Sequence, residues 1–215
     1  VVDIWAGHQD KAKTRPWEKD TIINVYSTTK TMTFICALML ADRGQLDLDA
    51  PVGNYWPEFN ANGKEAVLVK HLLSHSAGLP GFSRTFSNEE LYDWDFACAD
   101  LASQKSWWET GTQSGYHAIT QGYLIGEVVK RITGKSFGTF FREEVAEKVG
   151  ADFHIGVDPK HFERIADLVP AVETASILEM DPESIPGRVF SGLDITPENS
   201  TGTAGWRQAE IPAAN

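Results

Sequence analysis

The chain has 215 residues, of which 42% are hydrophobic and 23% charged, and this ordinary balance argues against disorder and against collagen-like or coiled-coil arrays. Its 19 basic and 30 acidic residues give a formal net charge of −11, which argues against nonspecific binding to nucleic acid or anionic membranes. Two cysteines, Cys36 and Cys98, are too few for a disulfide scaffold, although they could pair. The longest unbroken apolar stretch, 34–41, is far shorter than the ~20 residues of a membrane-spanning helix.

Two short segments near the N-terminus, 1–7 and 21–26, have the composition of strands, and a polar loop joins them. Residues 28–43 are apolar on nearly every side and stop at a glycine, which predicts a buried central helix. A short amphipathic helix is predicted at 67–75, where it ends at the turn-forming run 76–81.

Further helices are predicted in the second part of the chain. Residues 87–90 have the pattern of a capping box and open a helix that continues through Leu91, Trp94 and Leu101. Residues 118–133 carry apolar side chains at helical spacing, and Ser136 caps one more helix that ends near residue 149. Little periodicity remains in 151–215, where we expect loops and short elements. Because two strands are too few for a stable sheet, either this last region contains strands or the chain is part of a larger protein.

The segment Ser27-Thr28-Thr29-Lys30 lies where a strand-like segment meets the predicted buried helix. At positions i and i+3, the Ser27 hydroxyl and the Lys30 amine share one face of the first helical turn. Burial and the positive end of the helix dipole both disfavour an ammonium group there, so they lower the pKa of the lysine. A neutral amine can accept the serine proton, and a peptide N–H of the same helix start can stabilise an oxyanion. The alternative is a serine cap followed by a lysine that reaches solvent.

Two more segments follow in order, HLLSHSAGLPG at 71–81 and WWETGTQSGYHAITQGYLIG at 107–126. Together with VYSTTKTMTFICALMLADRGQLDLDAPV at 25–52, they resemble the serine β-lactamase-like family, most closely the class C β-lactamases and the carboxylesterases of the same fold. The resemblance implies an α+β, β-lactamase/transpeptidase-like fold, in which an antiparallel sheet with flanking helices lies beside a mainly helical domain. We expect part of the α/β domain in 1–60, a mainly helical domain with an irregular C-terminal part in 61–215, and an incomplete sheet.

The resemblance also implies roles for three residues. Ser27 would be the acylated nucleophile, Lys30 its proton partner, and Tyr116 the second-motif tyrosine that moves a proton between nucleophile and leaving group. A phenol becomes a base only where its phenolate is stabilised, and the alternative for Tyr116 is a packed tyrosine beside a helix start. Where β-lactamases usually have Tyr-x-Asn, this chain has Ala118, which favours ester over lactam substrates. The third motif, a Lys-Thr-Gly or His-Gly-Gly type turn that also supplies the second oxyanion donor, is not found.

Other candidates have a second interpretation each. Trp107 and Trp108 could form an apolar wall for an acyl group or pack the helical region. His117 could line the pocket as a substrate-binding residue or be a loop residue. His71 and His75 have an i, i+4 spacing that suits a metal, but no third ligand accompanies them, which favours a structural role. There is no Gly-x-Ser-x-Gly elbow and no phosphate-binding glycine loop, so we expect neither an α/β-hydrolase nor a metal or organic cofactor.

These observations predict a serine hydrolase that cleaves small carboxylic esters through an acyl-enzyme. A β-lactamase or D-alanyl-D-alanine peptidase is the alternative within the same family, and an inactive fragment or pseudo-enzyme with a binding role is the alternative outside catalysis. The partner is therefore expected to be a small ester or lactam. Since the chain opens in a strand-like segment without an initiator methionine and stops before the third motif, we expect N-terminal and C-terminal portions of a longer protein to be missing.

Overall fold

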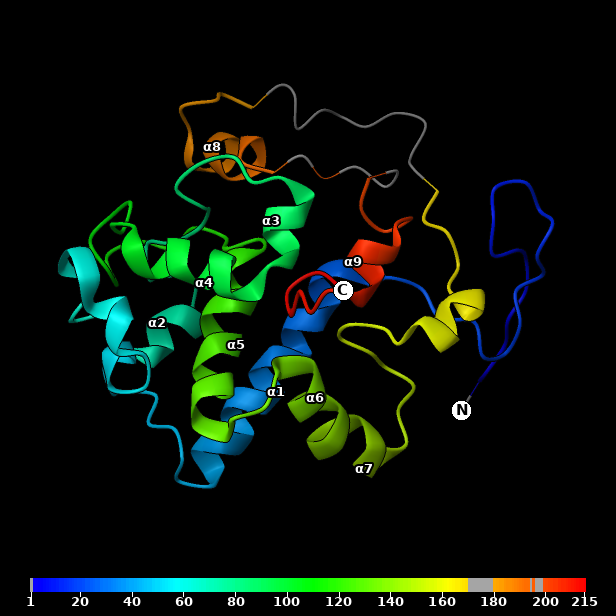
Figure 1. Ribbon diagram of the computed structural model, residues 1–215, viewed down its shortest axis with the longest axis horizontal. Helices are drawn as coiled ribbons and strands as arrows, with labels where there is room; N and C mark the ends of the chain where they lie inside the picture. The colour runs from blue at the N-terminus through cyan, green and yellow to red at the C-terminus, as the bar shows by residue number, and fades with distance from the viewer. Residues whose placement is uncertain (1, 170–179, 194, 196–198) are drawn as a thin grey trace.

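The computed structural model describes residues 2–169, 180–193, 195 and 199–215, and helices dominate it (Figure 1). The elements in chain order are η1 Tyr26–Thr28, α1 Thr29–Asp42, η2 Val52–Asn54, η3 Pro57–Gly63, α2 Val69–Leu73, α3 Asn88–Tyr92, α4 Trp94–Ser103, α5 Thr120–Thr133, α6 Phe137–Phe141, η4 Arg142–Ala146 (a π-helical turn), α7 Glu147–Val149, η5 Pro159–Arg164, α8 Ile185–Ser191 and α9 Ala204–Gln208. The helices predicted from 28, 67, 87, 118 and 136 onward are therefore confirmed.

Two helices of 14 residues each, α1 and α5, run side by side through the centre of the molecule (Figure 1). The inner face of α1 includes Cys36, Ala37 and Leu40, and each of them is 0% exposed. Burying a leucine side chain contributes about 1.5–3 kcal/mol, and these side chains belong to a core that also includes buried residues of α4, α5 and α6. Cys36 and Cys98 are both free and buried.

The helix predicted from the capping box forms as two helices. The box itself is confirmed, because Glu90 N–H donates to Ser87 Oγ at 3.2 Å and Ser87 N–H donates to Glu90 Oε2 at 3.0 Å. Asp93 then ends α3, and its carboxylate accepts the Phe96 N–H at 3.0 Å as the N-cap of α4. A short acidic side chain that bonds to the backbone ahead of it favours such a new start over helix continuation.

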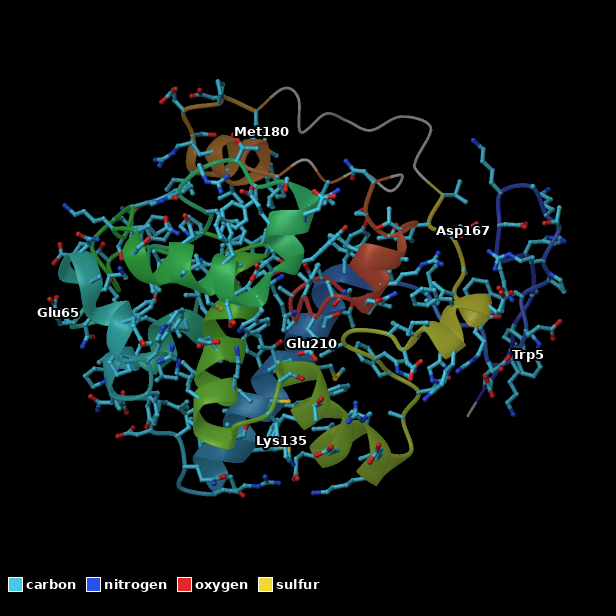
Figure 2. The ribbon with its side chains drawn as sticks, viewed as in Figure 1. Trp5, Glu65, Lys135, Asp167, Met180 and Glu210 are labelled. Atoms are coloured by element: carbon cyan, nitrogen blue, oxygen red, sulfur yellow. The ribbon has the colours of Figure 1, made fainter. Side chains whose placement is uncertain are left out.

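The strands predicted at 1–7 and 21–26 do not form in the described residues. Segment 21–26 makes one isolated parallel bridge, Ile22 to Ile165, and the described part of 1–7 makes none. A strand is stabilised by ladder partners on its neighbours, and a single bridge supplies too few of them. Val2 and Ile4 are 81% and 85% exposed, and Trp5 lies at the outer edge of the molecule (Figure 2). Within the described residues only isolated bridges form, which is consistent with the predicted incomplete sheet.

The region after 151 consists of short elements in its described parts, which confirms that prediction for them, while 170–179, 194 and 196–198 lie outside the described residues. Its last turn, 211–215, lies beside the N-terminal end of α1 (Figure 1). Glu210 just before this turn accepts hydrogen bonds from Ser136 and Gly138 at the start of α6 (Figure 2). Within the described residues, no helix is long and apolar enough to cross a membrane.

Candidate active site

Ser27 lies in η1, the single turn that leads into α1, and its side chain is exposed. Tyr26 before it has a φ of +45°, in the left-handed region that costs a non-glycine residue about 1–3 kcal/mol. Contacts with the C-terminal region offset this cost. The Tyr26 ring meets Trp206 edge-on at 6.4 Å, and the side chains of Thr201 and Ser200 hydrogen-bond its hydroxyl. The strained turn that presents Ser27 is therefore held by residues from the other end of the chain.

Lys30 follows Ser27 by one helical turn and is 5% exposed. Its Nζ lies 3.2 Å from Ser27 Oγ, 2.6 Å from the Ala118 carbonyl oxygen and 3.1 Å from the Ala213 carbonyl oxygen. Burial lowers the pKa of Lys30, and its contact with Tyr116 opposes this shift. A neutral amine has two N–H groups and one lone pair. In the neutral form both N–H groups can donate to the two carbonyl oxygens, which leaves the lone pair to accept the Ser27 hydroxyl proton.

Tyr116 reaches the same serine from the loop before α5. Its hydroxyl donates a hydrogen bond to Ser27 Oγ at 2.6 Å. Lys30 Nζ lies 4.9 Å from the centre of the Tyr116 phenol ring. The side chain is 49% exposed, so the hydroxyl is accessible to a small molecule at Ser27. The structure thus brings together Ser27, Lys30 and Tyr116, which are separated by up to 89 positions in sequence.

The last turn of the chain completes the surroundings of Lys30. Three successive carbonyl oxygens at 212–214 accept hydrogen bonds from Thr33, Lys30 and Asn24, at 2.5, 3.1 and 2.6 Å, respectively. Gly122 in α5 allows this approach, because a Cβ there would lie 2.6 Å from the backbone nitrogen of Ala213. The sequence does not predict this contact, because no periodicity or motif in 211–215 indicates that it packs against α1.

His117, adjacent to Tyr116, is 0% exposed. Its Nε2 accepts the Leu79 N–H at 3.1 Å, so its Nδ1 carries the proton and donates to the Gly115 carbonyl oxygen at 2.5 Å. Burial lowers the pKa of His117 to about 4, and the nearby His75 and Lys30 act in the same direction. Both ring nitrogens therefore bind the backbone, and the place of His117 in a substrate pocket stays a prediction.

The two tryptophans have different surroundings. Trp108 is 8% exposed and meets the His117 ring edge-on at 6.1 Å. Trp107 hydrogen-bonds Gln104, and the Arg188 guanidinium lies 3.8 Å from its ring centre. Their predicted part in binding an acyl group stays a prediction. Among the described residues, no group of three or more His, Cys, Asp or Glu is placed to hold a metal ion.

The family model described as Beta-lactamase matches residues 1–206. The chain belongs to the beta-lactamase family. Esterase/beta-lactamase LipL of Mycobacterium tuberculosis (strain ATCC 25618 / H37Rv) is 36% identical over 224 residues, which cover 100% of this chain and 52% of LipL. Esterase EstB of Burkholderia gladioli is 31% identical over 161 residues, covering 67% of this chain and 41% of EstB.

Solved structures show the same fold for this beta-lactamase-family chain. A family VIII carboxylesterase superposes with a TM-score of 0.90 at 41% identity, over 98% of this chain and 56% of that one. A penicillin-binding protein homologue from Caulobacter crescentus superposes with a TM-score of 0.86 at 37% identity, over 98% and 55% of the two chains. The β-lactamase/transpeptidase-like fold is thereby confirmed. The chain spans about half the length of these relatives.

Proposed function

We propose that the protein is a serine hydrolase that acts on small carboxylic esters through an acyl-enzyme. The observation that carries this proposal is the arrangement around Ser27 Oγ, which lies 3.2 Å from Lys30 Nζ and 2.6 Å from the Tyr116 hydroxyl. Relatives named as esterases and a family VIII carboxylesterase structure support the choice of substrate class.

The chemistry uses these three side chains. Ser27 Oγ bonds to the acyl carbon of the ester while the neutral Lys30 amine takes the hydroxyl proton. The bond between the acyl carbon and the alcohol oxygen then breaks, and the leaving alkoxide receives a proton through Tyr116. Water next attacks the acyl carbon and gives its proton to the Lys30 amine, which is neutral again after the alcohol has left. The bond to Ser27 Oγ breaks, the serine regains a proton, and the carboxylic acid leaves.

Two alternatives remain tied to particular observations. LipL is named as both an esterase and a beta-lactamase, and a penicillin-binding protein homologue shares the fold, which motivates a β-lactamase or peptidase activity. Ala118 stands where lactam-cleaving relatives usually have asparagine, so we expect the lactam to be the poorer substrate. A binding role without catalysis would follow if Ser27 is not reactive.

The test measures hydrolysis of p-nitrophenyl butyrate and of nitrocefin by the chain and by Ser27→Ala. We expect ester hydrolysis to exceed lactam hydrolysis and to fall about 10³-fold or more in Ser27→Ala, since the nucleophile is lost. Ser103→Ala, an exposed serine on α4 that bonds the Asp100 carbonyl, is the matched control and retains activity. Intact mass after treatment with a fluorophosphonate should show one label at Ser27. Unchanged hydrolysis in Ser27→Ala, or a wild-type chain without label, would overturn the proposal.

A further inference from the structure

His75 has a backbone conformation that is costly and that the proposed chemistry does not use. It follows α2 with a φ of +59°, in the left-handed region, where a residue with a Cβ pays about 1–2 kcal/mol. Its side chain is half-buried. A strained backbone of this kind persists where surrounding contacts hold it in place. The contacts of His75 therefore show which part of the structure depends on its conformation.

Those contacts converge on the residues before and after Tyr116. The Gly115 N–H donates to the His75 carbonyl oxygen at 3.1 Å. The His117 N–H donates to His75 Nδ1 at 3.1 Å. Between these two bonds, the His75 ring lies 5.0 Å from the Tyr116 ring, centre to centre. One residue thus binds the backbone on both sides of the tyrosine whose hydroxyl contacts the serine.

His117 reinforces the same loop from its other side. Its ring lies 5.4 Å from that of His75, and it ties the Leu79 N–H to the Gly115 carbonyl oxygen. Each imidazole accepts a backbone N–H at one nitrogen, so both rings must be neutral, His75 protonated at Nε2 and His117 at Nδ1. Burial lowers the pKa of His75, and Lys30 adds to this effect whenever it carries its proton, which is consistent with neutral rings.

We propose that His75 is a positioning residue, whose carbonyl oxygen and Nδ1 fix the backbone on both sides of Tyr116 and thereby set the Tyr116 hydroxyl against Ser27 Oγ. This inference rests on the proposed function for its kinetic consequence, but the placement of Tyr116 can be measured without it. A misplacement of about 1 Å in a reacting group can cost about 10²-fold in rate, so a clamp on this loop matters even though His75 touches no reacting atom.

Two substitutions of His75 distinguish the role of its Nδ1 acceptor from the role of its left-handed backbone. His75→Gly suits the left-handed conformation and keeps the carbonyl oxygen, but removes the Nδ1 acceptor. His75→Asn also tolerates this conformation and offers Oδ1 close to where Nδ1 lies, although the ring is lost. His71 supplies the matched control, because its Nδ1 also accepts a backbone N–H, that of Leu68 at 3.1 Å, away from Tyr116. His71→Ala removes that acceptor.

The first readout is the ring resonances of Tyr116 in the ¹³C-tyrosine-labelled chain, assigned with Tyr116→Phe. We expect both His75 variants to shift these resonances, because each removes the neighbouring imidazole ring, but only His75→Gly to broaden them, and His71→Ala to leave them at the wild-type positions. Tyr116 resonances as sharp in His75→Gly as in His75→Asn would overturn the positioning role, as would equal broadening in His71→Ala. Long-range ¹H–¹⁵N spectra should show His75 protonated at Nε2, and protonation at Nδ1 would also overturn it.

The second readout is the hydrolysis of p-nitrophenyl butyrate, with thermal unfolding measured for every variant. His75→Gly should lower kcat about 10- to 100-fold with KM within about twofold, while His75→Asn recovers most of the loss and His71→Ala has wild-type kcat. If His75→Gly and His75→Asn are equally slow, the acceptor is not what positions Tyr116. If the variants change the Tyr116 resonances as expected but the wild-type chain does not hydrolyse the ester, the proposed function is overturned and the positioning of Tyr116 is supported.

Discussion

Lowering the pH should destabilise this protein through His117 in particular. The folded state holds the pKa of His117 at about 4 because the ring is buried, whereas an unfolded histidine titrates near 6.5. Between these two values the unfolded chain binds a proton that the folded chain does not. The contribution of His117 to the free energy of unfolding is therefore fully present above pH 6.5 and is lost as the pH falls toward 4. The difference corresponds to roughly 3 kcal/mol of unfolding free energy at pH 4.

The variant His117→Asn isolates this contribution. Its amide can still donate to the Gly115 carbonyl oxygen, but it leaves the Leu79 N–H without an acceptor, so it starts about 1–3 kcal/mol less stable at pH 7. It has no proton to gain, so its stability should fall less steeply on acidification. Urea unfolding followed by tryptophan fluorescence, at pH 7 and pH 4, gives both free energies.

The quantity to compare is the loss of stability between the two pH values, because carboxylates elsewhere titrate in both proteins and cancel. We expect the wild-type chain to lose roughly 3 kcal/mol more than His117→Asn. Equal losses would contradict this expectation, since they would mean that the His117 ring accepts a proton in the folded state as readily as in the unfolded one.

Two further substitutions test the site from opposite sides. Tyr116→Phe removes a hydroxyl that lies 2.6 Å from Ser27 Oγ and should lower kcat/KM for the ester about 10²- to 10⁴-fold. Thermal stability should change little, because the Tyr116 side chain is 49% exposed. A wild-type kcat/KM in this variant would contradict the proton-transfer role of Tyr116. Gly122→Ala places a methyl group 2.6 Å from the Ala213 nitrogen and should destabilise the fold by about 1–3 kcal/mol in urea unfolding, although alanine favours a helix by ~1 kcal/mol. A more stable variant would contradict this close approach.

The helices were predictable because their signals are local. A serine cap with glutamate three residues later starts α3, and a glycine with φ of +70° ends α5, both within one turn of the helix concerned. Asp93 gave the same kind of signal, but it lay inside a continuous apolar pattern, so the division into α3 and α4 was not predicted. The strands at 1–7 and 21–26 were wrong for the described residues, because a strand depends on partners that sequence periodicity does not specify.

Some residues of the candidate active site were also predictable from local spacing, and others were not. The spacing of Ser27 and Lys30 places both side chains on one helical face, and this follows from the period of the helix alone. Tyr116 was assigned through the resemblance to a family, since no local rule connects residues 89 positions apart. The Ala213 carbonyl oxygen, 183 positions from Lys30, was missed, as was the left-handed corner at His75.

The amphipathic and buried helices, the caps and the adjacency of the serine and the lysine follow from the sequence, because each depends on interactions within a few residues. The lowered pKa of the lysine was also predicted from the sequence, but the groups that surround the amine depend on how distant segments pack. Burial lowers the pKa of Lys30, and carbonyl oxygens from two distant segments orient its hydrogens. Both effects come from removing water and replacing it with fixed dipoles, which requires that the remote segments be packed together.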